Sequence, residues 1–444
     1  MDTQFPARPG LGKFWSARQF KHLACVSVLL ACFAFQASAQ TNLQLSPLVI
    51  TTEAGLANFG AADGIGPVAK FFYPASVALD AWDNVYVADP YNDTIRKVTP
   101  SGLVTTLAGL AQTFGTNDGL GTNARFSYPF GIAVDPSGNV YVADTLNSTI
   151  RKITTNGAVT TFAGVSGLAA YQDGYVTNGG TNMATFAYPY GIAVNNSNTI
   201  YVADTYANLI RKITYEPAIN NWFVSTLAGD NNTNDLANGT NYGSNDGTGA
   251  GARFNHPYAL AADHAGNVYV ADTSNNLVRK ITSAGVVTTI AGTNNNGKFS
   301  SPSGIAVDAS TNIYVADTSN EVIQLLVTTD GTNWTVSPSS PLAGQTNIYG
   351  DGDGVHGSAS ATLNYPWGVA VDGLTNVYVG DSFNGNIREI TSAGTVPSSV
   401  LSTLAVLTGA SDFLFKPPMP FRPGSTSQTG WRWTAPVMLT SRTH

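Results

Sequence analysis

Six in-phase copies of one short unit run through residues 48 to about 409, and this repetition restricts the possible folds more than any other feature of the chain. One copy contains the strings Tyr128-Pro-Phe-Gly-Ile-Ala-Val-Asp135, Asn139-Val-Tyr-Val-Ala-Asp144, Thr149-Ile-Arg-Lys-Ile153 and Val159-Thr-Thr-Phe-Ala-Gly164. Units of this size that recur many times are typical of propellers and solenoids, in which neighbouring copies pack on one another.

The spacing inside the copies is constant, whereas the spacing between them is not. In every copy an aspartate follows a proline by fifteen residues, and in five copies an arginine follows that aspartate by seven residues. Ten residues separate Gly292 from Pro302, but 28 separate Gly229 from Pro257. Constant copies joined by variable segments indicate that the insertions gather on one face. The prolines are Pro74, Pro129, Pro189, Pro257, Pro302 and Pro366, and the arginines are Arg96, Arg151, Arg211, Arg279 and Arg388, with Gln324 in the fifth copy.

Within each copy, four runs rich in Val, Ile, Tyr and Thr are separated by clusters of Gly, Asn, Asp or Ser. This pattern predicts a four-stranded antiparallel meander. Such a sheet has two apolar faces that neighbouring sheets must cover, and closure of the sheets into a ring leaves only short edges. We therefore expect an all-β fold, a six-bladed β-propeller of four-stranded antiparallel blades.

The Pro-x-Gly-Ile-Ala-Val-Asp, Asn-Val-Tyr-Val-Ala-Asp and Ile-Arg-Lys-Ile strings resemble NHL repeats. The resemblance covers residues 48 to about 409 and implies a six-bladed propeller of the secreted bacterial type. It implies no single function, because NHL propellers include sensor domains, adhesive modules, RNA binders and a few metal-dependent lyases.

Two segments could supply the outer strand of the last blade. Leu48-Val-Ile-Thr-Thr-Glu-Ala-Gly55 resembles the fourth strand of the other copies, and Val400-Leu-Ser-Thr-Leu-Ala405 resembles Val224-Ser-Thr-Leu-Ala228. The spacing from Gly55 to Pro74 favours closure by the N-terminal segment, with the C-terminal segment as the alternative. Residues 40–410 would then form the propeller, and the Pro-rich tail over residues 411–444 fits no repeat.

The first 39 residues have the order of a signal peptide. Basic residues are followed by an apolar run from Leu23 to Phe35 and then by Ala37-Ser38-Ala39. A membrane anchor is the alternative, but the run is shorter than the about twenty apolar residues that a span needs. We expect cleavage before Gln40 and a secreted, periplasmic or cell-surface location. Lipidation of Cys32 is a second alternative.

The composition fits a folded, acidic protein. Hydrophobic residues make up 43% of the chain and charged residues 11%, which is too little charge for a disordered chain. Removal of residues 1–39 takes away four basic residues and one acidic residue, so the net charge changes from −7 to −10. Such a chain is a poor partner for nucleic acid. Both cysteines, Cys25 and Cys32, lie in the leader, so we expect no disulfide and no thiol nucleophile in the mature chain. We also expect no transmembrane segment in the mature chain, and a monomer.

The six repeated aspartates could bind Ca²⁺ as a ring of carboxylates. Each lies at the end of the second strand of its copy, where an aspartate accepts backbone hydrogen bonds and can meet the arginine seven residues on. A turn residue must recur in every blade, whereas a catalytic residue need not. We therefore expect a structural role for Asp89, Asp144, Asp204, Asp272, Asp317 and Asp381.

Asp-Gly-x-Gly also recurs between the copies, at Asp63, Asp118 and Asp246, with Asp351-Gly-Asp-Gly354 as a relative. Oxygen-rich loops can hold Ca²⁺, but Asp-Gly is equally typical of tight turns, and the acidic clustering of a calcium loop is missing. We expect turns, no metal site and no cofactor, with Ca²⁺ as the one ion that these carboxylates would suit.

The histidines give little support to catalysis. After cleavage the chain has His256, His264, His356 and His444, without a tight cluster in the sequence, whereas related metal-dependent lyases need histidines that converge on the channel. His256 replaces a tyrosine found in other copies, which favours packing. No Ser-His-Asp order or pair of glutamates is evident. We expect no catalytic residues, and a metal-dependent channel enzyme of the lyase or lactonase type is the alternative.

The residue after each repeated proline gives the candidate binding site. It is aromatic in four of the six copies, as Phe130, Tyr190, Tyr258 and Trp367. Because the first strand of a blade lines the channel, these side chains would form a collar at its mouth, with the residue two positions earlier on the same side. Packing between blades is the alternative. A purely structural position in a repeat tends to keep one residue type, and this position varies.

Together these patterns predict a secreted, non-catalytic module for binding or scaffolding. Its partner would be an extracellular protein, a peptide or a carbohydrate, held by the face that carries the insertions and by the collar. Repeat filler without a ligand in an envelope assembly is a further alternative.

We predict that the exported protein begins at Gln40, because the basic start, the apolar run and Ala37-Ser38-Ala39 match the three parts of a cleaved leader. N-terminal sequencing of exported protein measures this directly. A lipidated Cys32 or an intact leader would show that the prediction is wrong.

Overall fold

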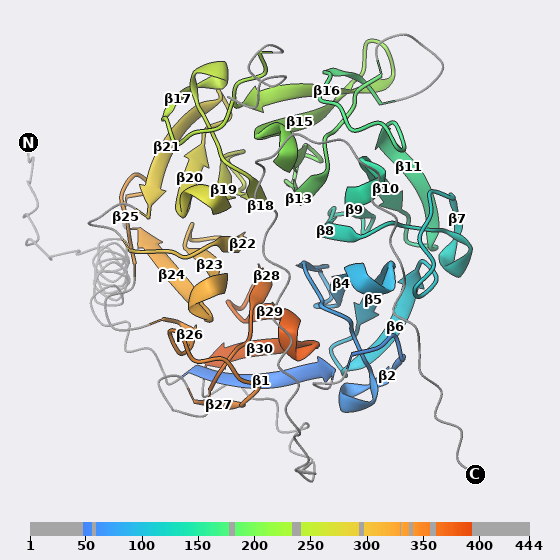
Figure 1. Ribbon diagram of the computed structural model, residues 1–444, viewed down its shortest axis with the longest axis vertical. Coiled ribbons are helices and arrows are strands. Elements are labelled where there is room, and N and C mark those ends of the chain that lie inside the picture. Colours follow the sequence, from blue (N-terminus) through green and yellow to red (C-terminus); the bar gives the residue numbers. More distant parts are fainter. Residues whose placement is uncertain are drawn as a thin grey trace, which may run out of the picture. The chain divides into compact units, whose positions relative to one another are not determined.

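The computed structural model describes residues 48–55, 59–176, 183–232, 241–292, 297–328, 330–336, 341–355 and 361–392. In these ranges the regular structure consists of short strands and single 3-10 turns. The strands form six antiparallel sheets arranged around a central axis (Figure 1). The predicted six-bladed β-propeller is therefore confirmed. The predicted leader, both cysteines, His356, the Val400–Ala405 segment and the tail over residues 411–444 lie outside the described residues.

In all six blades the strands follow one order, from the first strand at the axis outward to the fourth. The first blade has β3 (Val77–Leu79), β4 (Val85–Asp89), β5 (Thr94–Val98) and β6 (Leu103–Ala108), with β2 (Gly64–Ile65) outermost. The second has β8 (Pro129–Val134), β9 (Val140–Asp144), β10 (Thr149–Ile153), β11 (Ala158–Gly164) and β7 (Gly119–Leu120). The third has β13 (Pro189–Val194), β14 (Ile200–Asp204), β15 (Leu209–Glu216), β16 (Asn221–Ala228) and β12 (Gly174–Tyr175).

The remaining blades repeat this order with one variation. The fourth has β18 (Pro257–Ala262), β19 (Val268–Asp272), β20 (Leu277–Ile281), β21 (Val286–Ala291) and β17 (Gly247–Thr248). In the fifth, β22 (Pro302–Val307), β23 (Ile313–Asp317) and β24 (Val322–Thr328) are followed by β25 (Trp334–Val336) and β26 (Ala343–Gly344), which both pair with β24. The sixth has β28 (Pro366–Val371), β29 (Val377–Asp381), β30 (Asn386–Ser392), β1 (Leu48–Gly55) and β27 (Gly354–Val355).

Five of the blades thus carry a two-residue fifth strand outside the four that the sequence predicts. Each of these short strands begins at the glycine of an Asp-Gly pair, as at Gly64 and Gly119. The described part of the chain contains no helix long and apolar enough to cross a membrane.

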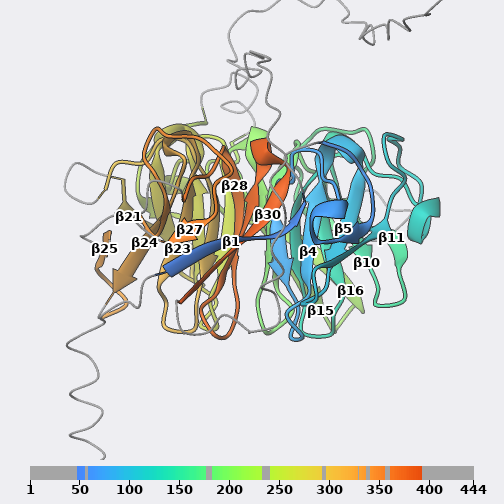
Figure 2. The same ribbon diagram turned by 90° about the horizontal axis from the view of Figure 1, so that it is seen from below.

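The hydrophobic core lies between the blades and not inside any one of them. Tyr141 and Ala143 of the second blade, for example, pack in one cluster with Phe186, Ile192 and Val202 of the third. The inner-strand residues alternate between the two faces of their sheet, so each blade is covered on both sides only when both neighbours are present. Figure 2 shows the strands running between the two faces of the ring.

The ring is closed by the N-terminal strand. β1 pairs antiparallel with β30, from Leu48 opposite Ser392 to Gly55 opposite Asn386, and Figure 1 shows the two strands side by side. The favoured N-terminal closure is therefore confirmed. Ser382 Oγ also donates a hydrogen bond of 2.5 Å to the carbonyl oxygen of Pro74, which joins the last blade to the first.

One arginine organises each blade except the fifth. Arg151 is buried, and its guanidinium donates to the repeated Asp144 and to the loop residue Asp118, both at 2.7 Å. It also donates to the carbonyl oxygens of Arg125 and Asn117 and lies 5.1 Å from the ring centre of Phe126. Five donors in a fixed fork suit arginine for such a junction. The equivalent ion pairs join Arg96 to Asp63 and Asp89, Arg211 to Asp173 and Asp204, Arg279 to Asp246 and Asp272, and Arg388 to Asp353 and Asp381.

The repeated aspartates lie in the blade interior, and their structural role stays a prediction. Asp144 accepts the backbone N–H of Ser127 at 2.7 Å and the side-chain amide of Asn147 at 2.8 Å, besides the arginine. Burial raises the pKa of Asp144 to about 6, and the charge of Arg151 together with these hydrogen bonds limits the rise. The carboxylate thus depends on its partners to stay ionised at neutral pH.

The loop aspartates have a role that the turn interpretation did not include. Asp63 accepts the backbone N–H and the hydroxyl of Thr106, at 3.0 Å each, while it pairs with Arg96. It thereby connects the outer strand, the third strand and the fourth strand of its blade. In the sixth blade Asp353, and not Asp351, takes this position.

The seam between the sixth and first blades has an unusual charge. Glu53 is the bulged residue of β1, a position occupied elsewhere by Leu107, Phe162, Leu227 and Ile290. Glu389 of β30 stands at the position of Lys97, Lys152, Lys212 and Lys280. Two carboxylates therefore meet where the first four blades have an apolar side chain and a lysine.

The environment of these glutamates favours their neutral form. Burial, then the charge of Glu389, raises the pKa of Glu53 to about 7. Burial also raises the pKa of Glu389, the hydrogen bond from Tyr378 opposes this rise, and Asp372 and Asp83 add to it. Like charges at short range that are partly withdrawn from water cannot all ionise cheaply. The contact between the sixth and first blades is therefore more stable when these glutamates are protonated.

We predict that Asp144→Ala lowers the free energy of unfolding by about 3 to 5 kcal/mol, because it leaves the buried Arg151 charge without its buried partner. The matched control is Asp317→Ala, since Asp317 faces Gln324 and its loss leaves no buried charge. We expect this control to cost about 1 to 3 kcal/mol. Urea unfolding of both variants measures the difference, and equal losses would contradict the role of the arginine.

We also predict that the seam makes stability depend on pH. A glutamate whose pKa is about 7 in the folded state and 4.5 in the unfolded state binds more protons when folded, so the free energy of unfolding falls as the pH rises from about 4.5 to 7. Glu53→Leu, which restores the residue type of Leu107, should remove about 2 kcal/mol of this fall. Urea unfolding at pH 5 and pH 8 tests it. A variant with the same pH dependence as the parent protein would refute the prediction.

Candidate functional site

One face of the ring, which we call the loop face, carries the first residues of the inner strands. The 3-10 turns after the second strands and the loops between blades lie on the same face. The pairing shows this directly, because Pro129 at the start of β8 lies opposite Asp144 at the end of β9, and Thr149 lies opposite Gly164. The turns after the second strands are η2 (Pro90–Asn92), η4 (Thr145–Asn147), η5 (Thr205–Ala207), η7 (Thr273–Asn275), η8 (Thr318–Asn320) and η9 (Ser382–Asn384).

The four predicted collar residues converge on the axis. The ring centres of Phe130 and Tyr190 are 4.7 Å apart, those of Tyr190 and Tyr258 are 4.9 Å apart and stacked, and those of Phe130 and Trp367 are 5.3 Å apart. These residues belong to the second, third, fourth and sixth blades, so only ring closure brings them together. Their role in binding a ligand stays a prediction.

The collar fills most of the channel at its level. Together with the small residues Ala75 and Ser303 of the first and fifth blades, it leaves a cavity of about 60 Å³, which holds a few waters. Burial, followed by the neighbouring tyrosines, raises the pKa of Tyr190, and burial and then Tyr206 raise the pKa of Tyr258 to about 12. The collar is an uncharged aromatic floor, and a ligand larger than water would rest above it.

A second ring of side chains surrounds this floor at the residue before each repeated proline. These residues are Tyr73, Tyr128, Tyr188, His256, Ser301 and Tyr365, and all have positive φ between 48° and 56°. Glycine would take this left-handed backbone without strain, whereas other residues cost about 1 to 2 kcal/mol. Four of the six are nevertheless tyrosine. The strained backbone therefore lowers the folding stability while it holds an aromatic side chain near the axis.

Side chains from the preceding blade support this backbone. Asp93 Oδ1 accepts the N–H of Tyr128 at 2.9 Å, and Glu321 accepts the N–H of Tyr365 at 2.5 Å. In the same way, Asn208 Oδ1 accepts the N–H of His256 and Asn276 Oδ1 accepts the N–H of Ser301, both at 2.8 Å. Each link joins two blades at the loop face and fixes the direction of the side chain that follows.

A third set of residues was missed by the sequence analysis. The middle residue of each turn after a second strand is Tyr91, Leu146, Tyr206, Ser274, Ser319 and Phe383. Tyr91 and Tyr206 are 38% and 45% exposed, so their rings are accessible at the loop face. The signal was present, since this residue lies two positions after each repeated aspartate and is aromatic in three copies.

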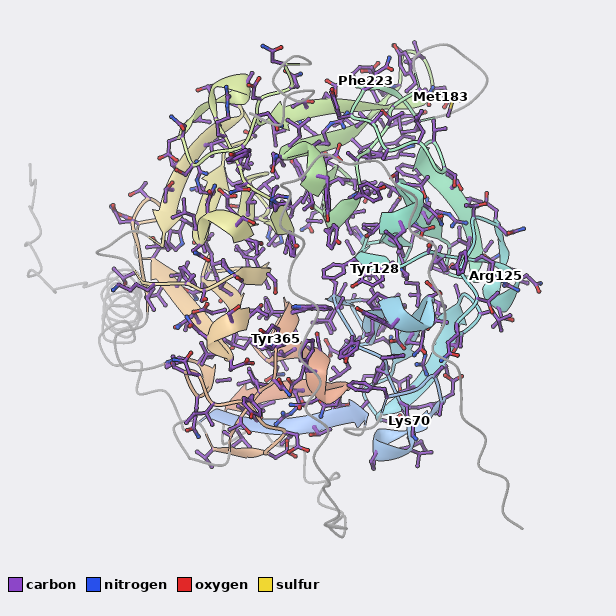
Figure 3. The ribbon with its side chains drawn as sticks, viewed as in Figure 1. Lys70, Arg125, Tyr128, Met183, Phe223 and Tyr365 are labelled. Atoms are coloured by element: carbon purple, nitrogen blue, oxygen red, sulfur yellow. The ribbon has the colours of Figure 1, made fainter. Side chains whose placement is uncertain are left out.

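The aromatic members of this set and of the second ring, with Phe59 and Phe72, form two groups of rings, which we together call the aromatic arc. The collar residues Phe130 and Tyr190 connect the two groups. Tyr73 contacts Tyr91 at 4.9 Å and Phe383 at 5.1 Å between ring centres, and Tyr365 stacks on Phe383 at 4.4 Å. Figure 3 shows Tyr128 and Tyr365 close to the centre of the ring, with Lys70 and Arg125 farther out. The aromatic arc comprises Phe59, Phe72, Tyr73, Tyr91, Tyr128, Tyr188, Tyr206, Tyr365 and Phe383.

The candidate ligands for a metal do not gather. Among the described residues, no three His, Cys, Asp or Glu side chains are close enough to hold a metal ion. His256 lies against Tyr206, at 5.4 Å between ring centres, and burial lowers its pKa. His264 is exposed in the turn between β18 and β19, on the face opposite the loop face.

Comparison with known proteins supports the repeat type. The NHL repeat model matches residues 126–153 and 186–213. The chain is 32% identical over 163 residues to human NHL repeat-containing protein 2, which covers 33% of this chain and 22% of that protein. It is 29% identical over 233 residues to mouse Teneurin-3, which covers 48% of this chain and 8% of that protein. The matches thus span less than a quarter of these relatives.

Solved structures agree on the fold. A protein of unknown function from Bacteroides thetaiotaomicron superposes with a TM-score of 0.55 at 19% identity, over 77% of this chain and 75% of that one. A catalytically inactive virginiamycin B lyase from Staphylococcus aureus reaches 0.46 at 14% identity, over 78% and 99%. The similarity to the Bacteroides protein supports the propeller fold, and at 19% identity it does not extend to an activity.

Proposed function

We propose that this propeller, which is built of NHL repeats, is a non-catalytic binding module that holds an extracellular protein, peptide or carbohydrate on its loop face. The observation that carries the proposal is the aromatic arc, two groups of rings that are linked through the collar residues Phe130 and Tyr190 and contributed by the first, second, third and sixth blades. Aromatic rings provide large contact areas at a low cost in side-chain entropy, and they dominate binding hot spots.

The accessibility of the rings supports this function. Phe59, Tyr91 and Tyr206 are 40%, 38% and 45% exposed, although tyrosine and phenylalanine normally gain free energy by burial. A group of exposed rings at one face is typical of an interaction site. The fixed backbone beneath them means that little ordering would be needed when a ligand binds.

The side chains around the axis favour binding over catalysis. A channel enzyme of the lyase or lactonase type would need ligands for a metal around the axis, and the described residues that line the cavity at the axis are aromatic, aliphatic or small. The repeated carboxylates are used within the blades, where each is paired or hydrogen-bonded. The acidic net charge of −7 for the whole chain argues against nucleic acid as the partner.

We predict that Tyr91→Ala and Tyr206→Ala each weaken binding of the partner by about 1 to 3 kcal/mol, the usual contribution of an aromatic anchor. Immobilised protein screened against glycan and peptide libraries identifies the partner, and calorimetry measures the variants. Because both rings are partly exposed, their loss should change the unfolding midpoint little.

The matched control is Trp82→Ala. Trp82 is 69% exposed in the turn between β3 and β4, on the face opposite the loop face, so its removal should leave binding unchanged. Absence of any saturable ligand, or equal loss of binding in all three variants, would overturn the proposal.

A further inference from the structure

The loop face is chemically divided around its axis. In the sixth, first, second and third blades, the residue before the repeated proline is always tyrosine. In the fourth and fifth blades the same positions are His256 and Ser301, and the middle residues of the turns are Ser274 and Ser319. We call these four residues the polar arc. An aromatic side and a hydroxyl-rich side therefore border the same closed collar.

Charged side chains are scarce at the centre of this face. Of the described residues there, Asp93 and Glu321 carry charge, and each accepts a backbone N–H from the next blade. Each uses one carboxylate oxygen for that bond. A charged ligand would find at the centre of the face only these two carboxylates, each already engaged on one side.

The cations of this face lie farther out and are mostly engaged. Arg125 donates to the carbonyl oxygens of Thr122 and Ala124, and Arg253 pairs with Asp230 at 2.7 Å. Lys70 and Arg125 lie toward the periphery in Figure 3, away from Tyr128 and Tyr365. Lys298 is exposed at the equivalent position of the fifth blade, four residues before Pro302. The centre of the face is therefore suited to an uncharged ligand.

From this division we infer that the ligand is an uncharged saccharide, bound with the C–H face of its rings against the aromatic arc and its hydroxyls toward the polar arc. The inference rests on the proposed binding function and narrows its partner to one class. A pyranose ring combines an apolar face with an edge of hydroxyl groups that both donate and accept hydrogen bonds. Serine hydroxyls and an imidazole offer both kinds of partner.

The rings of the aromatic arc are held in place for stacking. The ring centres of Tyr91 and Tyr128 are 5.4 Å apart in an edge-to-face contact. Tyr206 is fixed between Tyr188 and His256, at 5.2 and 5.4 Å. Rings that neighbouring rings hold in place lose little entropy when a sugar stacks on them.

A peptide fits the same surface less well. Extended peptides commonly add to the free edge of a sheet, and here the edges lie at the rim of the ring, where two-residue strands such as β2 and β7 end the sheets. Charged peptides would need the ion pairs that the centre lacks. An uncharged proline-rich peptide is the remaining rival and becomes one arm of the experiment.

Isothermal titration calorimetry of the whole chain tests the inference. The probes are neutral oligosaccharides of four to six glucose, xylose or N-acetylglucosamine units, an oligogalacturonate as the charged counterpart, and a proline-rich peptide. We expect binding of at least one neutral series that changes less than twofold between 50 and 500 mM NaCl, since no ion pair contributes.

Five variants locate the site. Tyr91→Ala and Tyr206→Ala should each weaken saccharide binding by tenfold or more, whereas Tyr91→Phe, which keeps the ring, should change it less than threefold. Ser274→Ala should weaken it about threefold to tenfold, because a donor and acceptor is lost from the polar arc. Trp82→Ala on the opposite face should have no effect. Circular dichroism and the thermal midpoint establish that each variant is folded.

The possible outcomes separate the two proposals. Saturable binding of the peptide or of the charged oligosaccharide alone, lost in Tyr91→Ala, would refute the saccharide and keep the binding module. Saccharide binding that survives both tyrosine variants would place the ligand elsewhere and refute the inference. No binding of any probe, together with no ligand in the wider screen, would overturn the proposed function itself.

Discussion

Each blade except the fifth is organised by one buried arginine whose guanidinium joins two carboxylates and two main-chain carbonyl groups. The pair of Arg151 with Asp144 lies inside the blade, and its pair with Asp118 fastens the loop that arrives from the previous blade. A buried charge is costly unless every partner is in place, so the arginine fixes the second, third and outer strands in a single arrangement. The positions of the turn that follows Asp144, and of the aromatic side chains on it, depend on this arrangement.

The fifth blade shows what happens without the arginine. Gln324 replaces it, and in the described residues no two-residue strand begins at an Asp-Gly pair before this blade. Instead, β25 and β26 both pair with β24. The arginine and the short outer strand are absent together. This is physically consistent, because the arginine is the cation that binds the loop carboxylate to the blade. The same blade contributes Ser301, Ser303 and Ser319 to the loop face, so the departure in framework coincides with the departure in surface chemistry.

The sequence was sufficient for the blades and the N-terminal closure, because these follow from spacing that the copies share. Three features were not predictable in the same way. The partnership of Arg211 with Asp173 joins residues 38 positions apart, and the Asp-Gly-x-Gly pattern omitted Asp173 because its second glycine is missing. The depth to which Phe130 and Tyr190 close the channel depends on side-chain size summed around a ring. The exposed Tyr91 and Tyr206 lie in turns, where strand alternation gives no direction for a side chain.

Closure by β1 also has a consequence for the order in which the ring can be assembled. Gly55 and its partner Asn386 stand at opposite ends of the propeller sequence, so the first strand of the chain has no permanent neighbour until β30 exists. Contacts at such sequence separation form late and slowly, and an open strand edge is prone to pair with the wrong partner. The first five blades can stack progressively from neighbour to neighbour, as in other repeat proteins. The sixth cannot. Completion of the ring is a single late kinetic event, and its rate is set by how quickly β1 and β30 come into contact.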